Sequence, residues 1–104
     1  MGLTTNRDDE CIKLIRTDGQ QQCYLVLPEE ERAKGFVRPV RRSYVHLKCG
    51  TVTTMAQAIA ETYARDPSFY GGTFCVGCGT HFNLREPGGY AFAWNPADGS
   101  YVGE

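Results

Sequence analysis

The first quarter of the chain alternates apolar and polar residues as a β-hairpin does. Asp18-Gly19 is typical of a two-residue hairpin turn and lies near the centre of the alternating stretch 11–27. This turn fixes the register, because a shift of one residue would move every side chain to the other face. The predicted apolar face consists of Ile12, Leu14, Cys23, Leu25 and Leu27, with Leu14 opposite Cys23 and Ile12 opposite Leu25.

A different period marks the middle of the chain. Apolar residues recur there at intervals of four, which predicts an amphipathic helix over 54–66. Thr54 and Gln57 have the spacing of a capping box, and Pro67 is expected to end the helix. The residues of its buried face are Met55, Ile59 and Tyr63.

The other segments are predicted to be short strands and turns around this helix. Residues 1–9 form a flexible polar tail, 28–35 a charged connection with one helical turn, and 36–48 an extended segment. Short strands over 73–84, 90–94 and 100–102 are separated by turns at 86–89 and 95–99. At 104 residues the chain fits one domain, 1–104, of the small α+β class with β-hairpins and one central helix.

One internal repeat changes this picture from fold to chemistry. The segment His46-x-x-Cys49-Gly-Thr has the same form as Cys75-x-x-Cys78-Gly-Thr. A two-residue spacer lets both side chains converge on one cation, and glycine after the second ligand permits a positive φ. Two such turns supply the four sulfur and nitrogen ligands that tetrahedral Zn²⁺ prefers. We therefore predict a zinc site formed by His46, Cys49, Cys75 and Cys78.

The repeat, over residues 46–80, resembles the zinc knuckles of the zinc-ribbon and treble-clef families. It departs from them in having histidine as the first ligand and a helix between the knuckles. Two other interpretations stay open: simple buried cysteines, and a redox-active Cys75/Cys78 pair. The redox interpretation would require a helix after Cys78, whereas the residues there have a strand pattern.

The fourth ligand has two candidates. His81 lies three residues after Cys78 and competes with His46, which the repeat favours because it occupies the position of Cys75. Cys11 and Cys23 lack knuckle spacing, so we expect Cys23 in the core and Cys11 as a free thiol. The odd number of five cysteines argues against a disulfide framework.

The predicted zinc site is structural and not catalytic. A catalytic zinc keeps one position open for water, whereas four protein ligands leave none open. The His-x-Glu and Pro-Cys-x-x-Cys pattern of zinc deaminases is missing, since Leu47 and Lys48 follow His46. We therefore expect no enzymatic activity.

A basic extended segment, 34–48, is the candidate contact surface. Its cations are interleaved with aromatic residues, a mixture that suits phosphates and bases, although the whole chain has a formal net charge of −1. The acidic residues just upstream would neutralise part of it. The candidate nucleic-acid or partner contacts are Arg38, Arg41, Arg42, Tyr44 and Lys48.

These features favour a zinc-stabilised binding module that acts as a protein-binding adaptor or inhibitor. The alternative is a nucleic-acid-binding module that uses segment 34–48. In size and style the chain is similar to zinc-ribbon-like proteins of bacteria, phages and mobile elements, among them anti-CRISPR proteins. Without a signal peptide or an apolar run of about 18 residues, we expect a cytoplasmic protein with no membrane contact. The sequence carries no prediction of oligomeric state.

Overall fold

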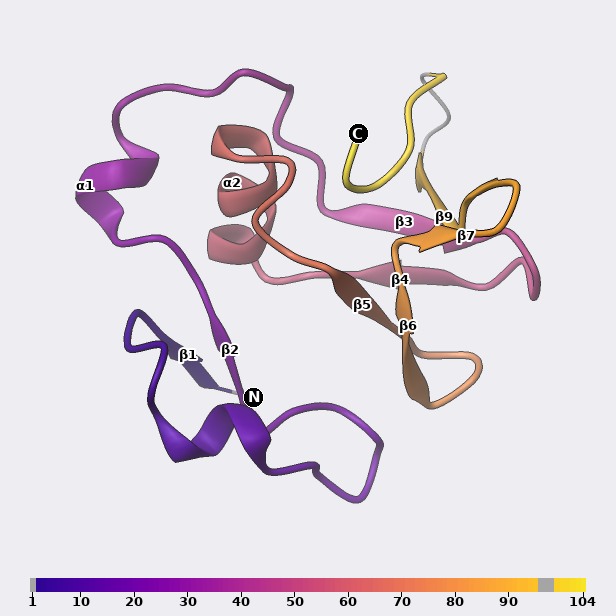
Figure 1. Cartoon of the computed structure of the whole chain (residues 1–104), viewed down its shortest axis with the longest axis horizontal. Coiled ribbons are helices and arrows are strands. Elements are labelled where there is room, and N and C mark those ends of the chain that lie inside the picture. Colours follow the sequence, from indigo (N-terminus) through magenta and orange to yellow (C-terminus); the bar gives the residue numbers. More distant parts are fainter. Residues whose placement is uncertain (1, 96–98) are drawn as a thin grey trace.

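A computed structural model describes residues 2–95 and 99–104 (Figure 1). It confirms the predicted small α+β class, with several β-hairpins and a central helix. The predicted turn at 95–99 falls mostly outside the described residues. The strands are β1 (Gly2–Thr4), β2 (Cys23–Leu25), β3 (Ser43–His46), β4 (Val52–Thr54), β5 (Gly72–Cys75), β6 (Thr80–Asn83), β7 (Arg85–Glu86), β8 (Gly89–Tyr90) and β9 (Phe92–Asn95). The helices are the 3-10 helix η1 (Glu10–Lys13), α1 (Glu29–Arg32) and α2 (Gln57–Arg65).

The centre of the fold is a three-stranded antiparallel sheet in the order β4-β3-β9. Tyr44 pairs with Trp94 and His46 with Phe92, so these four side chains lie on the same face, and all four are buried. Helix α2 contributes Tyr63 to the same core, where its ring meets the Trp94 ring edge-on. The period-two pattern of the strands thus gives this sheet one buried face.

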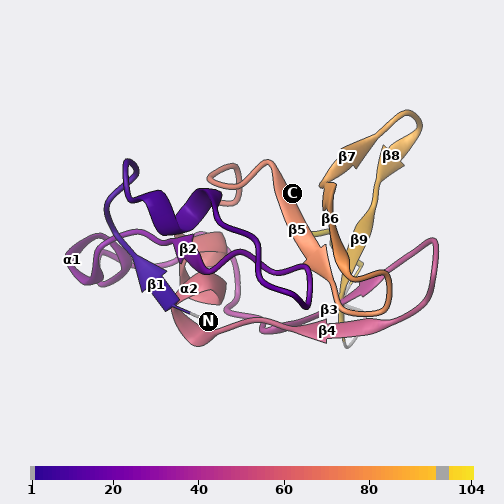
Figure 2. The same cartoon turned by 90° about the horizontal axis from the view of Figure 1, so that it is seen from below.

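The hairpin β5–β6 packs across the buried face of this sheet (Figure 2). Tyr44, which is 2% exposed, donates from its hydroxyl to the Phe74 carbonyl at 2.5 Å. The Thr73 hydroxyl donates to the Tyr44 oxygen at 3.1 Å. This buried phenol therefore joins the end of β5 to β3, the two strands that each lead into a knuckle.

The N-terminal segment differs from the predicted hairpin. Residues 10–13 form η1, capped by the Asp9 carboxylate, and Ile15 makes only an isolated bridge with Gln21. The register is one residue away from the predicted one, and Leu14 is 53% exposed instead of buried. The reason lies in the turn, where Asp18 accepts from the Gln20 backbone N–H and only the glycine after it has a positive φ.

Two further expectations for this segment were wrong. Part of the predicted flexible tail is strand β1, which pairs in parallel with β2. Cys11 is not a free thiol, because it forms a disulfide with Cys23 across a sequence separation of 12. Cys23 is buried as expected, at 4% exposure. The disulfide and the β1–β2 pair together hold residues 2–25 as one folded segment.

Helix α2 is confirmed in its body but not at its start. Ile59 and Tyr63 are buried, and the helix ends before Pro67. The cap residue is Ala56 with no side-chain cap bond, so the capping box of Thr54 and Gln57 does not form. Thr54 is instead the last residue of β4, since pairing with β3 uses its extended backbone.

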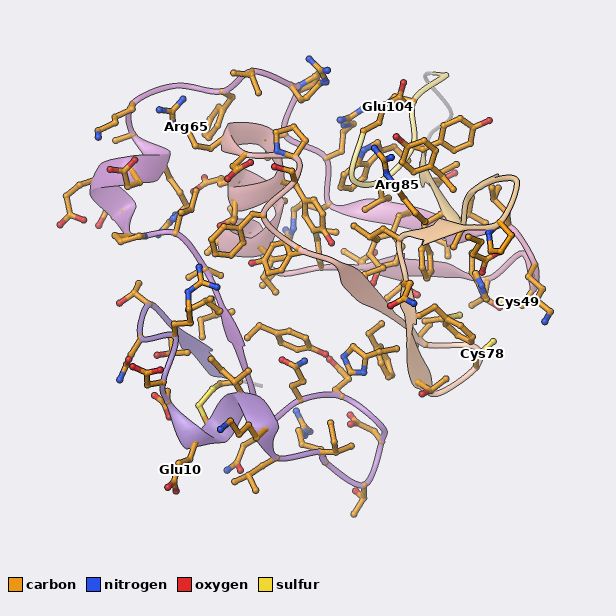
Figure 3. All side chains as sticks on the ribbon, viewed as in Figure 1. Glu10, Cys49, Arg65, Cys78, Arg85 and Glu104 are labelled. Atoms are coloured by element: carbon orange, nitrogen blue, oxygen red, sulfur yellow. A yellow bond between two sulfur atoms is a disulfide. The ribbon has the colours of Figure 1, made fainter. Side chains whose placement is uncertain are left out.

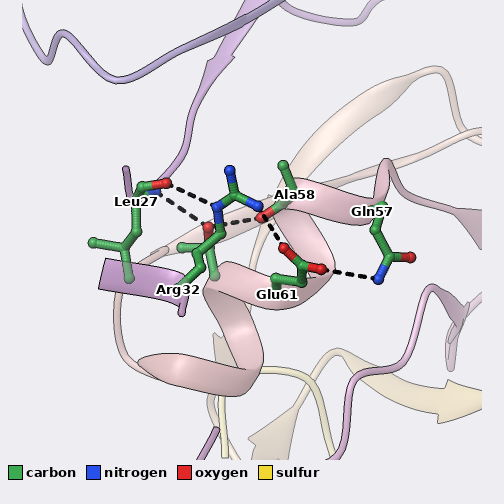
Figure 4. A network of polar contacts seen from close by, with 6 residues as sticks. Leu27, Arg32, Gln57, Ala58 and Glu61 are labelled. Atoms are coloured by element: carbon green, nitrogen blue, oxygen red, sulfur yellow. Dashed lines mark hydrogen bonds and ion pairs between the residues drawn. The ribbon is translucent and has the colours of Figure 1, made fainter. Parts of the chain in front are cut away.

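An ion pair joins the two α-helices (Figure 4). Arg32 of α1 bonds to Glu61 of α2 and donates from Nε to the Leu27 carbonyl at 3.0 Å. The Glu61 carboxylate also accepts from Gln57 at 3.2 Å, and these two partners lower its pKa, with Gln57 the larger cause. Among the described residues, no helix is long and apolar enough to cross a membrane.

Candidate metal centre

Both knuckles fold into the same backbone turn, as the sequence repeat predicts. The Gly50 N–H donates to the His46 carbonyl at 2.6 Å, and the Gly79 N–H donates to the Cys75 carbonyl at 2.8 Å. The φ values of Gly50 and Gly79 are +75° and +68°, which L side chains rarely adopt. Each turn closes a hairpin, β3–β4 in the first case and β5–β6 in the second. Each hairpin therefore ends in one pair of ligand side chains.

The two hairpin tips bring the four predicted side chains together. The ligand atoms of His46, Cys49, Cys75 and Cys78 all lie within 4.8 Å of one another. Cys49 Sγ is 3.5 Å from Cys75 Sγ, and Cys78 Sγ is 3.7 Å from His46 Nδ1. Zinc–sulfur bonds of about 2.3 Å put two tetrahedral ligands roughly 3.8 Å apart. The group can therefore hold a metal ion such as zinc.

The group lies at one end of the molecule and is half enclosed. Cys75 and His46 are buried, at 0% and 1% exposure, whereas Cys49 and Cys78 are exposed. Figure 3 shows Cys49 and Cys78 at the tips of their hairpins, far from the yellow disulfide beside η1. A metal ion here would be reached from solvent on the Cys49 and Cys78 side only.

The imidazole of His46 is fixed between two aromatic rings. Its centroid lies 4.6 Å from that of Phe82 and 4.8 Å from that of Phe92. Nδ1 faces Cys78, and the buried Nε2 has no hydrogen-bond partner among the described residues. Nδ1 is therefore the ring nitrogen that is placed to bind a cation together with the cysteine sulfurs, although a metal-bound histidine usually donates from its other nitrogen.

The thiols of the exposed pair differ in acidity. Hydrogen bonds from the side chain and then the backbone of Thr51 lower the pKa of Cys49 to about 6. Desolvation, followed by hydrogen bonding to Cys75 and Cys49, raises the pKa of Cys78 to about 11. Thiolate is the form that binds zinc, so the hydrogen bonds from Thr51 favour the zinc-binding form of Cys49.

The two knuckles also touch each other directly. A Cβ built on Gly77 would collide with the side chain of Thr51 in the other knuckle. The Val76 N–H donates to the Thr53 hydroxyl at 3.1 Å, beside this contact. Glycine at position 77 thus allows the close approach that sets the distance between the ligand pairs.

His81, the competing ligand, lies outside the metal group. Its Nε2 is 2.9 Å from the Tyr24 hydroxyl, and its ring packs near Phe74. Burial lowers the pKa of His81. The other group of metal-binding residue types among the described residues, Asp9 with Cys11 and Cys23, has its two sulfurs bonded to each other.

The candidate contact residues of segment 34–48 lie in different environments. Tyr44 is buried in the core, which corrects its prediction as a contact residue. The Arg41 guanidinium lies 4.6 Å from the centroid of the Trp94 ring. Arg42 Nε donates to the Met55 carbonyl at 3.0 Å, and Arg38 bonds to the carbonyl of the preceding residue. Lys48 is exposed in the first knuckle.

The sequence interpretation missed the disulfide. Its signal was the cysteine count: three of the five cysteines lie in the metal group, which leaves Cys11 and Cys23 as a pair. A disulfide is more typical of oxidising compartments than of the cytosol. The cytoplasmic location therefore stays a prediction that this bond argues against.

Comparison of the chain with protein-family models, with curated proteins and with solved structures yields no match. The chemistry of the group therefore rests on its own geometry: two equivalent turns, four converging ligand atoms and a buried imidazole.

Proposed function

We propose that this chain is a zinc-stabilised, non-enzymatic module that binds another protein. The observation that carries the proposal is the convergence of four sulfur and nitrogen ligand atoms within 4.8 Å. A site that joins two hairpin tips lowers the free energy of the folded chain when the ion binds, because the unfolded chain has no such site. The unit is zinc-ribbon-like in its two knuckles, with α2 inserted between them.

The structural role follows from the ligand set. Four protein ligands complete the tetrahedron that zinc prefers, so no position remains for a reacting water molecule. The ligand group consists of one histidine and three cysteines and includes no carboxylate to serve as a base. These points support a module without catalytic activity.

The protein-binding role is supported by apolar residues near the metal. Leu47 is 51% exposed in the first knuckle, and Val76 is 55% exposed in the second. Val52, at the start of β4 between them in the chain, is 45% exposed. Exposed aliphatic side chains that gather around a rigid site are typical of contact surfaces for other proteins. An adaptor or inhibitor needs such a surface and no chemistry.

Nucleic-acid binding is the weaker alternative. Arg41 packs over the Trp94 ring, and Tyr44 cannot stack on a base because it is buried. Its test is retention on single-stranded DNA at low salt by the unchanged chain and by a variant with Arg38, Arg41 and Arg42 changed to Gln. Equal retention of the two would exclude this alternative.

The zinc proposal is tested by metal analysis of the chain purified without chelators. We expect about one zinc per chain and a large loss of thermal stability after chelation. Changing Cys49 and Cys78 together to Ser should reproduce the effect of the chelator. A folded chain with less than half an equivalent of metal, and with unchanged melting in chelator, would contradict the proposal.

A further inference from the structure

The outer edge of β4 is open for hydrogen bonding. The Met55 N–H donates to the Arg42 carbonyl at 2.7 Å, just beyond the end of the β3–β4 pair. Hydrogen-bonded pairs alternate along an antiparallel ladder, so Thr53 faces β3 in the same way. The backbone groups of Val52 and Thr54 therefore point away from β3, and β4 is an edge strand of its sheet (Figure 1).

The opposite edge of the same sheet is covered. The Trp94 N–H donates to the Ser100 carbonyl at 3.3 Å, and the Val102 N–H donates to the Phe92 carbonyl at 3.0 Å. Residues 100–102 thus satisfy the outer groups of β9. Among the described residues, no comparable segment pairs with β4, and natural sheets usually protect such an edge.

An apolar cavity opens beside this edge. It is formed between β4, α2, β5 and the N-terminal segment. The centre of a water molecule could occupy a volume of about 50 Å³ inside it. One water needs roughly 10–15 Å³ by this measure, so the space suits an aliphatic group of a few heavy atoms. None of its lining residues carries a formal charge, and they include Tyr24, Tyr44, Met55, Ile59, Tyr63 and Phe74.

Positive charge brackets the edge. Two cations lie near the ends of β4, and the strand itself contains no Asp or Glu. Arg42 lies at one end of β4, bonded to the Met55 carbonyl, and Lys48 precedes the other end in the first knuckle. The loop that contributes Gln20 to the cavity also carries the carboxylate of Asp18. This carboxylate is paired with Arg16 at 3.7 Å. The surroundings of β4 thus complement an acidic ligand.

We propose that an extended acidic segment of a partner protein adds to the edge of β4 and inserts one aliphatic side chain into this cavity. The inference rests on the proposed protein-binding function and names its site and ligand chemistry. Strand addition supplies main-chain hydrogen bonds, and a pocket for one side chain supplies specificity. The cavity lies on the side of the sheet to which every second residue of an added strand points.

The test uses the zinc-loaded full chain and a displayed library of random ten-residue peptides. Selected peptides should share one Leu, Ile, Val or Met with Asp or Glu on either side, and should perturb the amide resonances of Val52 and Thr54. Val52→Pro should weaken binding at least tenfold, because it removes an N–H that points away from β3. Val52→Thr keeps that N–H and should bind as the unchanged chain does.

Peptide variants test the same geometry without changing the protein. Every second peptide residue should donate its backbone N–H to β4, and N-methylation of any one of these residues should abolish binding. N-methylation of the residues between them should leave binding nearly unchanged. Replacing the aliphatic residue with Ala should weaken binding about tenfold, in line with loss of a buried side chain of about 1.5 kcal/mol or more. Replacing the acidic residues with Lys should also weaken it.

Zinc content and melting of the same samples separate this inference from the proposed function. Two results with a folded, zinc-loaded chain would contradict the edge site but not the proposed function. In the first, N-methylation weakens binding equally at odd and even peptide positions. In the second, bound peptides perturb the resonances of Leu47 and Val76 instead of those of Val52 and Thr54. A library that yields no binding peptide would also contradict the edge site. Self-association of the chain that Val52→Pro abolishes would contradict it as well, because the strand added to β4 would then come from a second copy of this chain. A metal-free folded chain would contradict the proposed function itself.

Discussion

The hydroxyl of Tyr24 and Nε2 of His81 lie 2.9 Å apart and join the N-terminal segment to the second metal hairpin. Tyr24 follows the disulfide-bonded Cys23, and His81 lies three residues after the candidate ligand Cys78. Close to this bond, a Cβ on Gly19 would collide with the Gly79 carbonyl of the second knuckle. The disulfide-bonded segment thus packs directly on the hairpin that carries half of the candidate metal site.

The burial of His81 predicts a pH dependence of stability. Burial lowers the pKa of His81 from its ordinary value of 6.5, so the unfolded chain takes up a proton at higher pH than the folded chain does. The contribution of His81 is therefore fully present above pH 6.5 and declines as the pH falls below it. Denaturant unfolding at pH 7.5 and 5.5 should show a smaller loss of unfolding free energy in His81→Gln than in the unchanged chain.

Tyr24→Phe is the control for this prediction. It removes the hydroxyl and should lower the unfolding free energy by about 1 kcal/mol at both pH values, in line with one hydrogen bond. Because the cause of the shift at His81 is burial, this variant should keep most of the pH dependence. Equal pH dependence in His81→Gln and the unchanged chain would contradict the assignment to His81.

Substitutions of the two histidines should distinguish ligand from neighbour. His46→Ala is expected to lose bound zinc, and His81→Ala is expected to retain about one equivalent. His46→Cys is the control for loss of the ring. It places at position 46 the same thiol ligand that Cys75 provides at the equivalent position of the other knuckle, so it should again bind about one zinc. Zinc analysis after gel filtration measures all three. Metal loss in His81→Ala with retention in His46→Ala would reverse the assignment.

Local chemistry explains what the sequence predicted well. The positive φ of Gly50 and Gly79 and the pairing of two ligand side chains in each turn follow from the repeat, because each knuckle is a turn of a few residues. The body of α2 follows from its apolar period. These features depend on neighbours in the chain, which a single sequence displays directly.

Features set by tertiary contacts were missed or misplaced. The Asp18-Gly19 turn suits a tight hairpin, but contact of Gly19 with the second knuckle and the hydrogen bond from Gln20 to Asp18 favour a wider loop. Helix α2 starts later than predicted, because Thr54 belongs to β4 and pairs with β3. The burial of Tyr44 depends on β5 packing across the sheet, which the sequence of the basic segment does not reveal.

The disulfide should stabilise the N-terminal segment without affecting the metal site. Closing a loop of this size lowers the entropy of the unfolded chain, and about 3 kcal/mol is expected for roughly fifteen residues. Cys11→Ala with Cys23→Ala should lower the unfolding free energy by about that amount and keep one zinc per chain. Leu14→Ala, at a 53% exposed residue of the same segment, should change it by under about 0.5 kcal/mol. Loss of zinc from the double variant would show that the metal hairpin needs this segment.

Apart from the four candidate ligands, the contact between the two knuckles is the feature on which zinc affinity should depend most. Gly77→Ala adds a methyl group that meets the side chain of Thr51, so the knuckles must move apart and the ligand distances must grow. Since zinc–ligand bonds tolerate only about 0.2 Å, we expect at least a tenfold loss of zinc affinity in competition with a chelating dye. Gly71→Ala is the matched control, because a Cβ there meets no atom within 4 Å. It should bind zinc as the unchanged chain does, and equal affinity of the two variants would show that the contact between Gly77 and Thr51 does not set the metal geometry.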